Sequence, residues 1–206
     1  MYRLFYAEGS AACGPRVMLE EIGAPYSLIH TEIGADRPRD PELLAHNPNG
    51  WVPVLVDGGM AMHEASAISI FLADRHPEAG LAPFASEAAR GPFLQWMVYM
   101  SNTLQIAYQL TYHWARYCTG EAARESLQQR SCERLNEVWG FIDTAIGDRP
   151  WFVGDRFSAA DIHLHTLSTW LSPEMGHPEI GAFPNAARIA ARVAQRPSVR
   201  LVHGLL

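Results

Sequence analysis

The chain has 206 residues, 48% of them apolar, and a formal net charge of −6, which is enough apolar material for one sizeable core or two small ones. It has no basic cluster among its aromatic residues and so does not fit nucleic-acid binding. No apolar run reaches membrane-spanning length and no signal peptide precedes Tyr2, so we expect a cytoplasmic protein without a membrane partner. The three cysteines, Cys13, Cys118 and Cys132, lack the spacing of a disulfide framework and fit reduced thiols.

The first part of the chain predicts a strand, a helix and a second strand. Tyr2–Tyr6 has strand character, and residues 7–12 form a loop of mostly small side chains. Pro15 takes the favoured first position of a helix that ends at Gly23. Residues 26–32 are then expected to form the second strand.

A hairpin and a helix follow an irregular helical segment. Residues 57–59, D-G-G, supply the tight turn between strands at 54–56 and 60–62. The next helix begins near Glu64 and has apolar residues at i, i+3 and i+4. The order of elements is a βαβ unit joined to a ββα unit, which is the arrangement of a thioredoxin-like α/β domain.

The Val52-Pro53 bond lies where the first hairpin strand should begin. A proline has no N–H to donate, so it belongs at the first residue of a strand or at an edge. The trans isomer is the more common one, and spacing alone favours it. The cis isomer costs an X-Pro bond only about 0.5–1 kcal/mol and would turn the backbone N–H and C=O of Val52 outward, to pair with an extended peptide.

The helix start at Glu64, Ala65 and Ser66 is a candidate binding site. The unpaired N–H groups and the positive dipole of a helix start would hold a carboxylate on Ala65 and Ser66, while Glu64 would face an ammonium group. Acids and serines also cap helices where no ligand is bound. Together with residues 47–55, this segment predicts a pocket for a small, extended, doubly charged peptide.

From about residue 86 the chain is predicted to be entirely helical. Apolar residues recur at helical spacing from Phe93 onward, and further helices are expected at 158–172 and 184–196. One aromatic stripe fits a core, and part of it fits the wall of an apolar second-substrate pocket. Its members are Trp96, Tyr99, Tyr108, Tyr112 and Trp114.

Two short motifs in the helical half have structural interpretations. Ser158 and Asp161 have the spacing of a capping box, in which the two side chains accept backbone N–H groups at the start of a helix. We interpret this pair as an element that stabilises the fold, and not as a binding or catalytic site. His163 and His165 are two residues apart, so on a helix they do not share a face. No carboxylate or cysteine set completes a ligand group, and a metal site is not expected.

Separated segments of the chain resemble the cytosolic glutathione S-transferases. Residues 47–55, N-P-N-G-W-V-P-V-L, resemble the family's N-P-x-G-x-V-P-x-L segment, and residues 64–68 its E/Q-S-x-A-I helix start. Residues 81–83 resemble the family's linker, 157–161 its buried helix start and 193–199 its terminal helix signature. The resemblance spans essentially the whole chain and is greatest to bacterial members of the beta and zeta type.

The resemblance implies an α/β thioredoxin-like domain at 1–78 that binds glutathione, a linker at 79–85 and an all-helical domain at 86–206 with a second-substrate pocket. It further implies a homodimeric enzyme that activates the thiol of glutathione, its co-substrate, for attack on a small apolar electrophile. The substrate-binding residues it implies are Trp51, Val52, Pro53, Glu64, Ala65, Ser66, Asn102 and Gln105. Gln105 stands in place of the beta-type helper histidine, and Ala65 in place of the usual serine.

The chain departs from the family at the catalytic position, which falls on Ala11. A free thiol has a pKa near 8.5, so some donor must stabilise its thiolate. Ser10 would serve as that donor after a small shift of the loop. Alternatively, Cys13 near a helix start would be a low-pKa thiol that forms mixed disulfides, or a buried small residue. If neither residue acts in this way, backbone N–H groups or Tyr6 stabilise the thiolate, or the activity is weak.

Two other functions stay open at this point. One is a glutathione-dependent thiol-disulfide reductase or isomerase, which would need Cys13 or a zeta-like second site. The other is a catalytically silent glutathione-binding module, which Ala11 favours.

Overall fold

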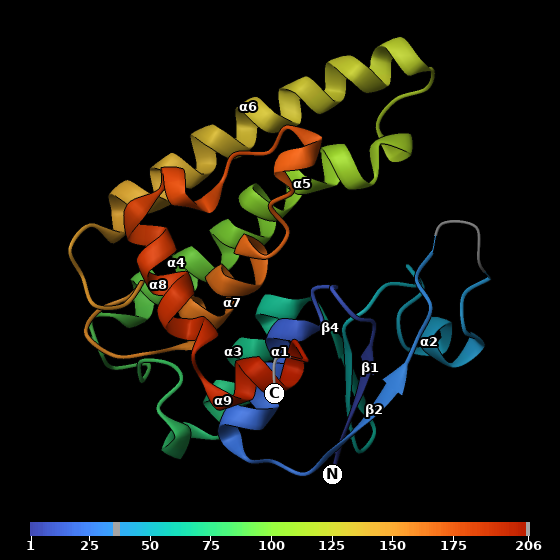
Figure 1. The fold of residues 1–206 in the computed structure, drawn as a ribbon. Coiled ribbons are helices and arrows are strands. Elements are labelled where there is room, and N and C mark those ends of the chain that lie inside the picture. Colours follow the sequence, from blue (N-terminus) through green and yellow to red (C-terminus); the bar gives the residue numbers. More distant parts are fainter. Residues whose placement is uncertain (35–37, 205–206) are drawn as a thin grey trace. The chain divides into compact units, whose positions relative to one another are not determined.

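The computed structural model describes residues 1–34 and 38–204. Its contacts divide the chain into two compact units, drawn in Figure 1. The first contains residues 1–87 and the C-terminal segment from residue 194, and the second contains residues 88–193. The domain limits expected from the sequence stay a prediction, because compactness alone does not define which segments fold independently.

The first unit contains a four-stranded mixed sheet. Its strands are β1 (Tyr2–Tyr6), β2 (Tyr26–His30), β3 (Val54–Asp57) and β4 (Met60–His63), in the order β2-β1-β3-β4. β1 is parallel to β2 and antiparallel to β3, and β3 and β4 form the predicted hairpin. The thioredoxin-like fold is confirmed, although β2 ends two residues earlier than its sequence predicts.

Helices cover both faces of this sheet. Figure 1 shows α1 (Cys13–Ile22) and α3 (Ala65–Arg75) on one face and α2 (Pro41–His46) on the other. α1 begins before the predicted residue, so Pro15 is its third residue, a position where a missing N–H is still harmless. Gly23 closes α1 in the left-handed conformation, as its sequence predicts.

The last helix, α9 (Pro197–Val202), packs against α1. It is separate from α8 because Pro197 starts a new helix. The Arg196 guanidinium binds the Glu21 carboxylate with both ends, at 2.7 and 2.6 Å, and Ser198 donates a third hydrogen bond. Burial opposes ionisation of Glu21, yet these hydrogen bonds lower its pKa.

The second unit is helical, as predicted. Its helices are α4 (Arg90–Tyr99), α5 (Gln105–Tyr112), α6 (Glu121–Ile146), α7 (Ala159–Ser168) and α8 (Pro184–Ala194), with a π-helical segment at Met100–Leu104 between α4 and α5. α7 and α8 end before their predicted limits at 172 and 196. Over the described ranges, 1–34 and 38–204, no helix combines the length and the apolar character that a membrane crossing needs.

Tyr108 holds the core of the second unit together. Its hydroxyl donates to the Leu167 carbonyl at 2.8 Å and accepts the indole N–H of Trp139 at 3.0 Å. Burial raises the pKa of Tyr108 far above its usual value, so it stays protonated. Trp96 is also buried, whereas Tyr112 is 40% exposed, so only part of the aromatic stripe is core.

The capping box at the start of α7 is confirmed. Asp161 is fully buried and accepts the N–H groups of Ser158 and Phe152, both at 2.8 Å. The Ser158 hydroxyl oxygen accepts the N–H of Ala160 at 3.3 Å. Burial raises the pKa of Asp161 to about 6, against the effect of these hydrogen bonds. The carboxylate thereby ties the loop at Phe152 to the helix start.

Asp161→Asn is expected to lower the free energy of unfolding by about 2 kcal/mol, because an amide offers one acceptor oxygen where the carboxylate offers two. Ser158→Ala should cost about 1 kcal/mol, the usual effect of a lost cap. Urea unfolding at pH 7 measures both. An Asp161→Asn variant as stable as the parent would contradict the assigned role.

Candidate functional site

Strand register brings the three predicted segments of the site to one end of the sheet. Phe5 of β1 pairs with Val54 of β3, and Val54 pairs with His63 of β4. The loop after β1, the residues before β3 and the start of α3 therefore all leave the sheet from one row of paired residues.

The buried Asn47 side chain organises the loop that leads into β3. Its amide N–H donates to the Trp51 carbonyl at 2.8 Å, and its oxygen accepts the N–H of Asn49 at 3.1 Å. The Asn47 carbonyl accepts the N–H of Gly50 at 2.8 Å. The guanidinium of Arg39 lies 4.6 Å from the centre of the Trp51 ring. The sequence alone did not predict Asn47 as a functional residue. An asparagine is nevertheless a known turn signal, because its side chain can bond the backbone two residues onward, as Asn47 does with Asn49.

The Val52-Pro53 bond is cis, so the trans isomer favoured by spacing is wrong. Val52 is buried, and its backbone N–H and C=O form no hydrogen bond with any residue of the described ranges. Backbone groups of this kind need a partner, which water or a ligand must supply. The backbone of an extended peptide would be such a partner.

Glu64 precedes α3 with its backbone in the left-handed region. Its φ is +76°, the only positive value among the non-glycine residues that the structure describes. Its side chain makes no capping hydrogen bond and is 76% exposed, with His63 Nδ1 3.8 Å from its carboxylate. Helix capping by its side chain therefore does not explain why a glutamate stands before α3. Strained backbone of this kind is concentrated at functional sites, at about 1–3 kcal/mol each.

Ala65 and Ser66 form the first turn of α3 and are both buried. α3 is 11 residues long, and its first N–H groups have no partner within the helix. This helix start thus places the positive end of the helix dipole next to the exposed Glu64 carboxylate.

Ser10 is held inside the loop that follows β1. Its buried hydroxyl donates to the Ala7 carbonyl at 2.6 Å and accepts the N–H of Ala12 at 3.2 Å. A hydroxyl has one proton, and this one is already used. Ala11, where the family resemblance places the catalytic residue, is half-buried beside it.

Cys13 opens α1 and is only 3% exposed. Burial raises the pKa of its thiol, although a hydrogen bond from Tyr6, whose oxygen lies 3.9 Å from Sγ, acts in the opposite direction. Burial also raises the pKa of Tyr6, which keeps its hydroxyl protonated and facing Cys13. This environment counts against a low-pKa thiol at Cys13 and fits the alternative of a buried small residue.

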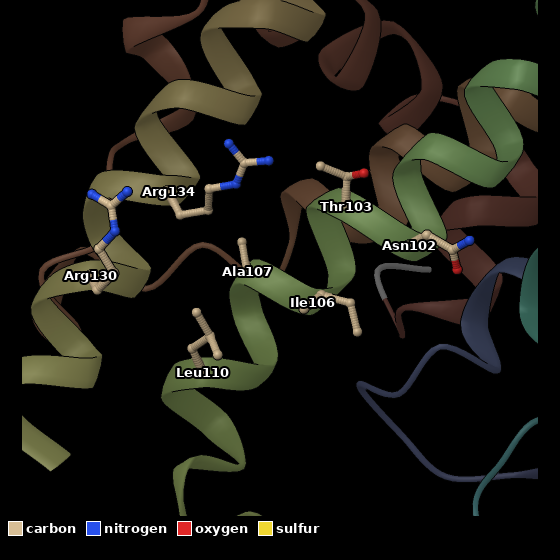
Figure 2. Close-up of a pocket in the computed structure, with 7 residues that line it drawn as sticks. All are labelled: Asn102, Thr103, Ile106, Ala107, Leu110, Arg130 and Arg134. Carbon is tan, nitrogen blue, oxygen red and sulfur yellow. The ribbon is translucent and has the colours of Figure 1, made fainter. Parts of the chain in front are cut away.

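In the helical unit, Asn102 lines a pocket of about 300 Å³ between α5 and α6 (Figure 2), whereas Gln105 is not among its lining residues. We call this cavity the α5–α6 pocket. The sequence prediction missed its other members, whose only visible signal was two arginines one helical turn apart. The lining residues are Asn102, Thr103, Ile106, Ala107, Leu110, Arg130 and Arg134.

Comparison with known proteins identifies the family. Residues 2–74 match the model of the glutathione S-transferase N-terminal domain, and residues 106–197 that of the C-terminal domain. Glutathione S-transferase F14 of Arabidopsis thaliana is 30% identical over 187 residues, which are 87% of this chain and 74% of that protein. The chain belongs to the glutathione S-transferase family.

Bacterial relatives of this glutathione S-transferase family member agree along nearly the whole chain. GstA of Escherichia coli O157:H7 is 26% identical over 96% of this chain and 95% of its own length. The structure of a sphingomonad glutathione S-transferase complexed with glutathione has a TM-score of 0.85 and 25% identity, and the match covers 98% of each chain. The resemblance stated from the sequence is confirmed.

Gly50→Ala is expected to lower the free energy of unfolding by about 1 kcal/mol more than Gly58→Ala. Both glycines have positive φ, +69° and +59°, so both variants carry the same conformational cost. Only at residue 50 would the new Cβ meet other atoms, at 2.9 Å from Cγ of Arg39 and 3.3 Å from Cδ2 of Leu44. Equal destabilisation in urea unfolding would show that the loop adjusts to the added methyl group.

Proposed function

We propose that this protein is a cytoplasmic glutathione transferase that joins glutathione to a small apolar electrophile. The observation that carries the proposal is the unpaired backbone of Val52, which lies at the same end of the sheet as the exposed Glu64 and the start of α3. The relative solved in complex with glutathione supports it.

Glutathione has an extended peptide backbone with a charged amino acid group at one end, and each part has a proposed partner. Its cysteinyl backbone pairs with Val52, with Trp51 and Pro53 beside it, in the manner of an added strand. The γ-glutamyl carboxylate binds the first N–H groups of α3 at Ala65 and Ser66, and its ammonium faces Glu64. Asn102 and Gln105 are proposed to contact the second substrate.

In the reaction, the glutathione thiol gives its proton to solvent and the thiolate lone pair forms a bond to the electrophilic carbon. A leaving group on that carbon departs with its bonding electrons. Ala11 has no hydroxyl and the Ser10 proton is bonded to Ala7, while the N–H groups of Ala12 and Cys13 are bonded to Ser10. We therefore assign thiolate stabilisation to the backbone N–H groups of Ala11 and Gly14, on either side of them. Ser10 then acts as a positioning residue that shapes this loop, and lowering the thiol pKa by two units needs about 2.7 kcal/mol.

The pKa of bound glutathione tests this mechanism directly. Thiolate absorbance in the ultraviolet, measured against pH with and without protein, should show a pKa below that of free glutathione. Ala11→Ser adds a hydroxyl donor at the partly exposed catalytic position and should lower this pKa by about one further unit and raise the turnover rate about tenfold. Ala11→Gly, which adds no donor, is the matched control.

An unshifted pKa in the parent protein would overturn thiol activation while leaving glutathione binding intact. An equal effect of Ala11→Ser and Ala11→Gly would show that loop freedom, not the hydroxyl, changes the thiol. No binding of glutathione at all would contradict the assignment of Val52 and Glu64.

A silent glutathione-binding module is the second candidate, because the Ser10 proton is already used and Ala11 has none to offer. It predicts glutathione binding with an unshifted thiol pKa. The buried, raised-pKa thiol of Cys13 argues against the reductase alternative, and a Cys13→Ser variant that retains full disulfide exchange would remove it.

The family resemblance also leads us to propose a homodimer. Light scattering in buffer should give the mass of two chains, and the same mass is expected with glutathione present. A mass equal to that of one chain, 22.9 kDa, would contradict the proposal.

A further inference from the structure

A cavity of about 430 Å³ in the first unit lies at the end of the sheet opposite the candidate glutathione site. Tyr2, which begins β1, and Asp57, which ends β3, both line it. The pair that serves the glutathione site, Phe5 with Val54, lies at the other end of the same two strands. We call this cavity the Tyr2 pocket. Its volume is within the range of small-molecule sites.

The Tyr2 pocket contains neighbouring side chains of opposite charge. Nη2 of Arg75 lies 3.3 Å from Oδ2 of Asp57, and both residues line the pocket. Within residues 1–34 and 38–204, neither side chain forms a hydrogen bond with another residue. The Arg75 side chain is 57% exposed, and an ion pair this accessible to solvent contributes little to stability. The guanidinium N–H groups and the carboxylate oxygens are therefore available to a ligand.

The Tyr2 hydroxyl adds an acceptor to the pocket. Its oxygen lies 2.9 Å from Nε2 of His76, while Nδ1 of His76 lies 3.3 Å from a carboxylate oxygen of Glu78. A carboxylate only accepts, so Nδ1 carries the proton of the neutral ring and Nε2 accepts the Tyr2 hydroxyl proton. Burial raises the pKa of Tyr2, Asp57 raises it further and Arg75 lowers it, so both charges act on this hydroxyl. The lone pairs of the Tyr2 oxygen remain for a donor on a ligand.

Two helices end at the Tyr2 pocket. α1 ends at Ile22 and α3 ends at Arg75, and both of these residues line the cavity. Figure 1 shows the two helices on the same face of the sheet, where they pack against each other. The C-terminal end of a helix carries a partial negative charge. Both helix ends therefore add to the Asp57 carboxylate in favouring a cationic group on the ligand.

We propose that the Tyr2 pocket binds an α-amino acid with an apolar side chain, in its zwitterionic form. The carboxylate of the ligand binds the Arg75 guanidinium, whose planar N–H donors match an oxyanion. The ammonium group lies between the Asp57 carboxylate and the Tyr2 oxygen, which both accept. The apolar side chain packs on Ile22 and Pro25, which also line the pocket.

The neighbouring opposite charges decide the class of ligand. A simple acid that binds Arg75 brings its charge close to Asp57, and a simple amine that binds Asp57 is repelled by Arg75. An α-amino acid carries both charges, separated by one carbon atom, so each meets its opposite in the pocket. Among the described residues, the pocket shares no lining residue with the candidate glutathione site, so amino-acid binding does not rest on the proposed transferase function.

Probes with the same apolar body separate the two charges. L-Phenylalanine carries both, 3-phenylpropanoate carries only the carboxylate, and 2-phenylethylamine carries only the ammonium group. Isothermal titration calorimetry of the full chain at pH 7 should show that L-phenylalanine binds about tenfold more tightly than either analogue. Saturating glutathione should leave L-phenylalanine binding unchanged, because the two sites lie at opposite ends of the sheet.

Variants that remove one charge should change which probe the pocket prefers. Arg75→Gln should weaken L-phenylalanine binding about tenfold and tighten 2-phenylethylamine binding about threefold, because the Asp57 charge is then unopposed. Asp57→Asn should weaken L-phenylalanine binding about tenfold and tighten 3-phenylpropanoate binding about threefold, because the Arg75 charge is then unopposed. Both side chains are partly exposed, so the fold should tolerate these substitutions.

Arg3→Gln and Glu42→Gln are the matched controls. Arg3 and Glu42 also form a partly exposed ion pair in the first unit, and neither residue lines the Tyr2 pocket. Arg3 follows Tyr2 in β1, so its side chain lies on the opposite face of the sheet. Each control removes the same charge as its counterpart and should change the binding of all three probes less than twofold.

An amino-acid site is contradicted if the parent protein does not bind L-phenylalanine, or if either analogue binds as tightly. Displacement of L-phenylalanine by glutathione would place it at the glutathione site and overturn the proposal. Equal weakening by Arg3→Gln and Arg75→Gln would show a general effect of charge and would overturn it too. Glutathione affinity should stay at the parent value in every variant, and a parent protein that binds L-phenylalanine but not glutathione would contradict only the proposed transferase function.

Discussion

The central position of β1 in the sheet is the constraint on which the candidate glutathione site depends. β1 hydrogen-bonds to β2 on one side and to β3 on the other, and the register that pairs Phe5, Val54 and His63 aligns the ends of three segments. Shifting any strand by one residue would turn its side chains to the opposite face and separate the loop, the cis bond and the start of α3. Backbone pairing rather than side-chain chemistry therefore assembles the site.

Much of the fold follows from local sequence signals. The D-G-G turn, the alternation around it and Gly23 predict elements that the structure contains, because turns and helix ends need particular backbone conformations. The ends of β2, α7 and α8 were misplaced, since strand pairing and proline positions decide them. The cis isomer of the Val52-Pro53 bond could not be predicted from residue spacing. X-Pro bonds generally prefer trans, and the surrounding loop selects cis here.

The site was predictable in outline but not in its hydrogen bonds. Motif positions located Val52, Glu64 and the loop around Ser10. The use of the Ser10 proton by Ala7 and the burial of Cys13 depend on how the chain folds back on itself, which no motif encodes. Both findings favour backbone N–H groups of the loop, rather than side chains, as the donors in the proposed stabilisation of the thiolate. A pocket lined by arginines on α6 also emerged only from the packing of two helices.

The backbone at Glu64 shows where stability and function compete. Glycine is the residue that a φ of +76° favours, and the Glu64 side chain neither caps α3 nor is buried. With glutamate instead of glycine at this position, the free energy of the folded state is higher, because a side chain disfavours positive φ. The start of α3 is thus a point at which the folded chain is less stable than its own topology allows, and the charge kept there is exposed to solvent, where the proposed ligand would meet it.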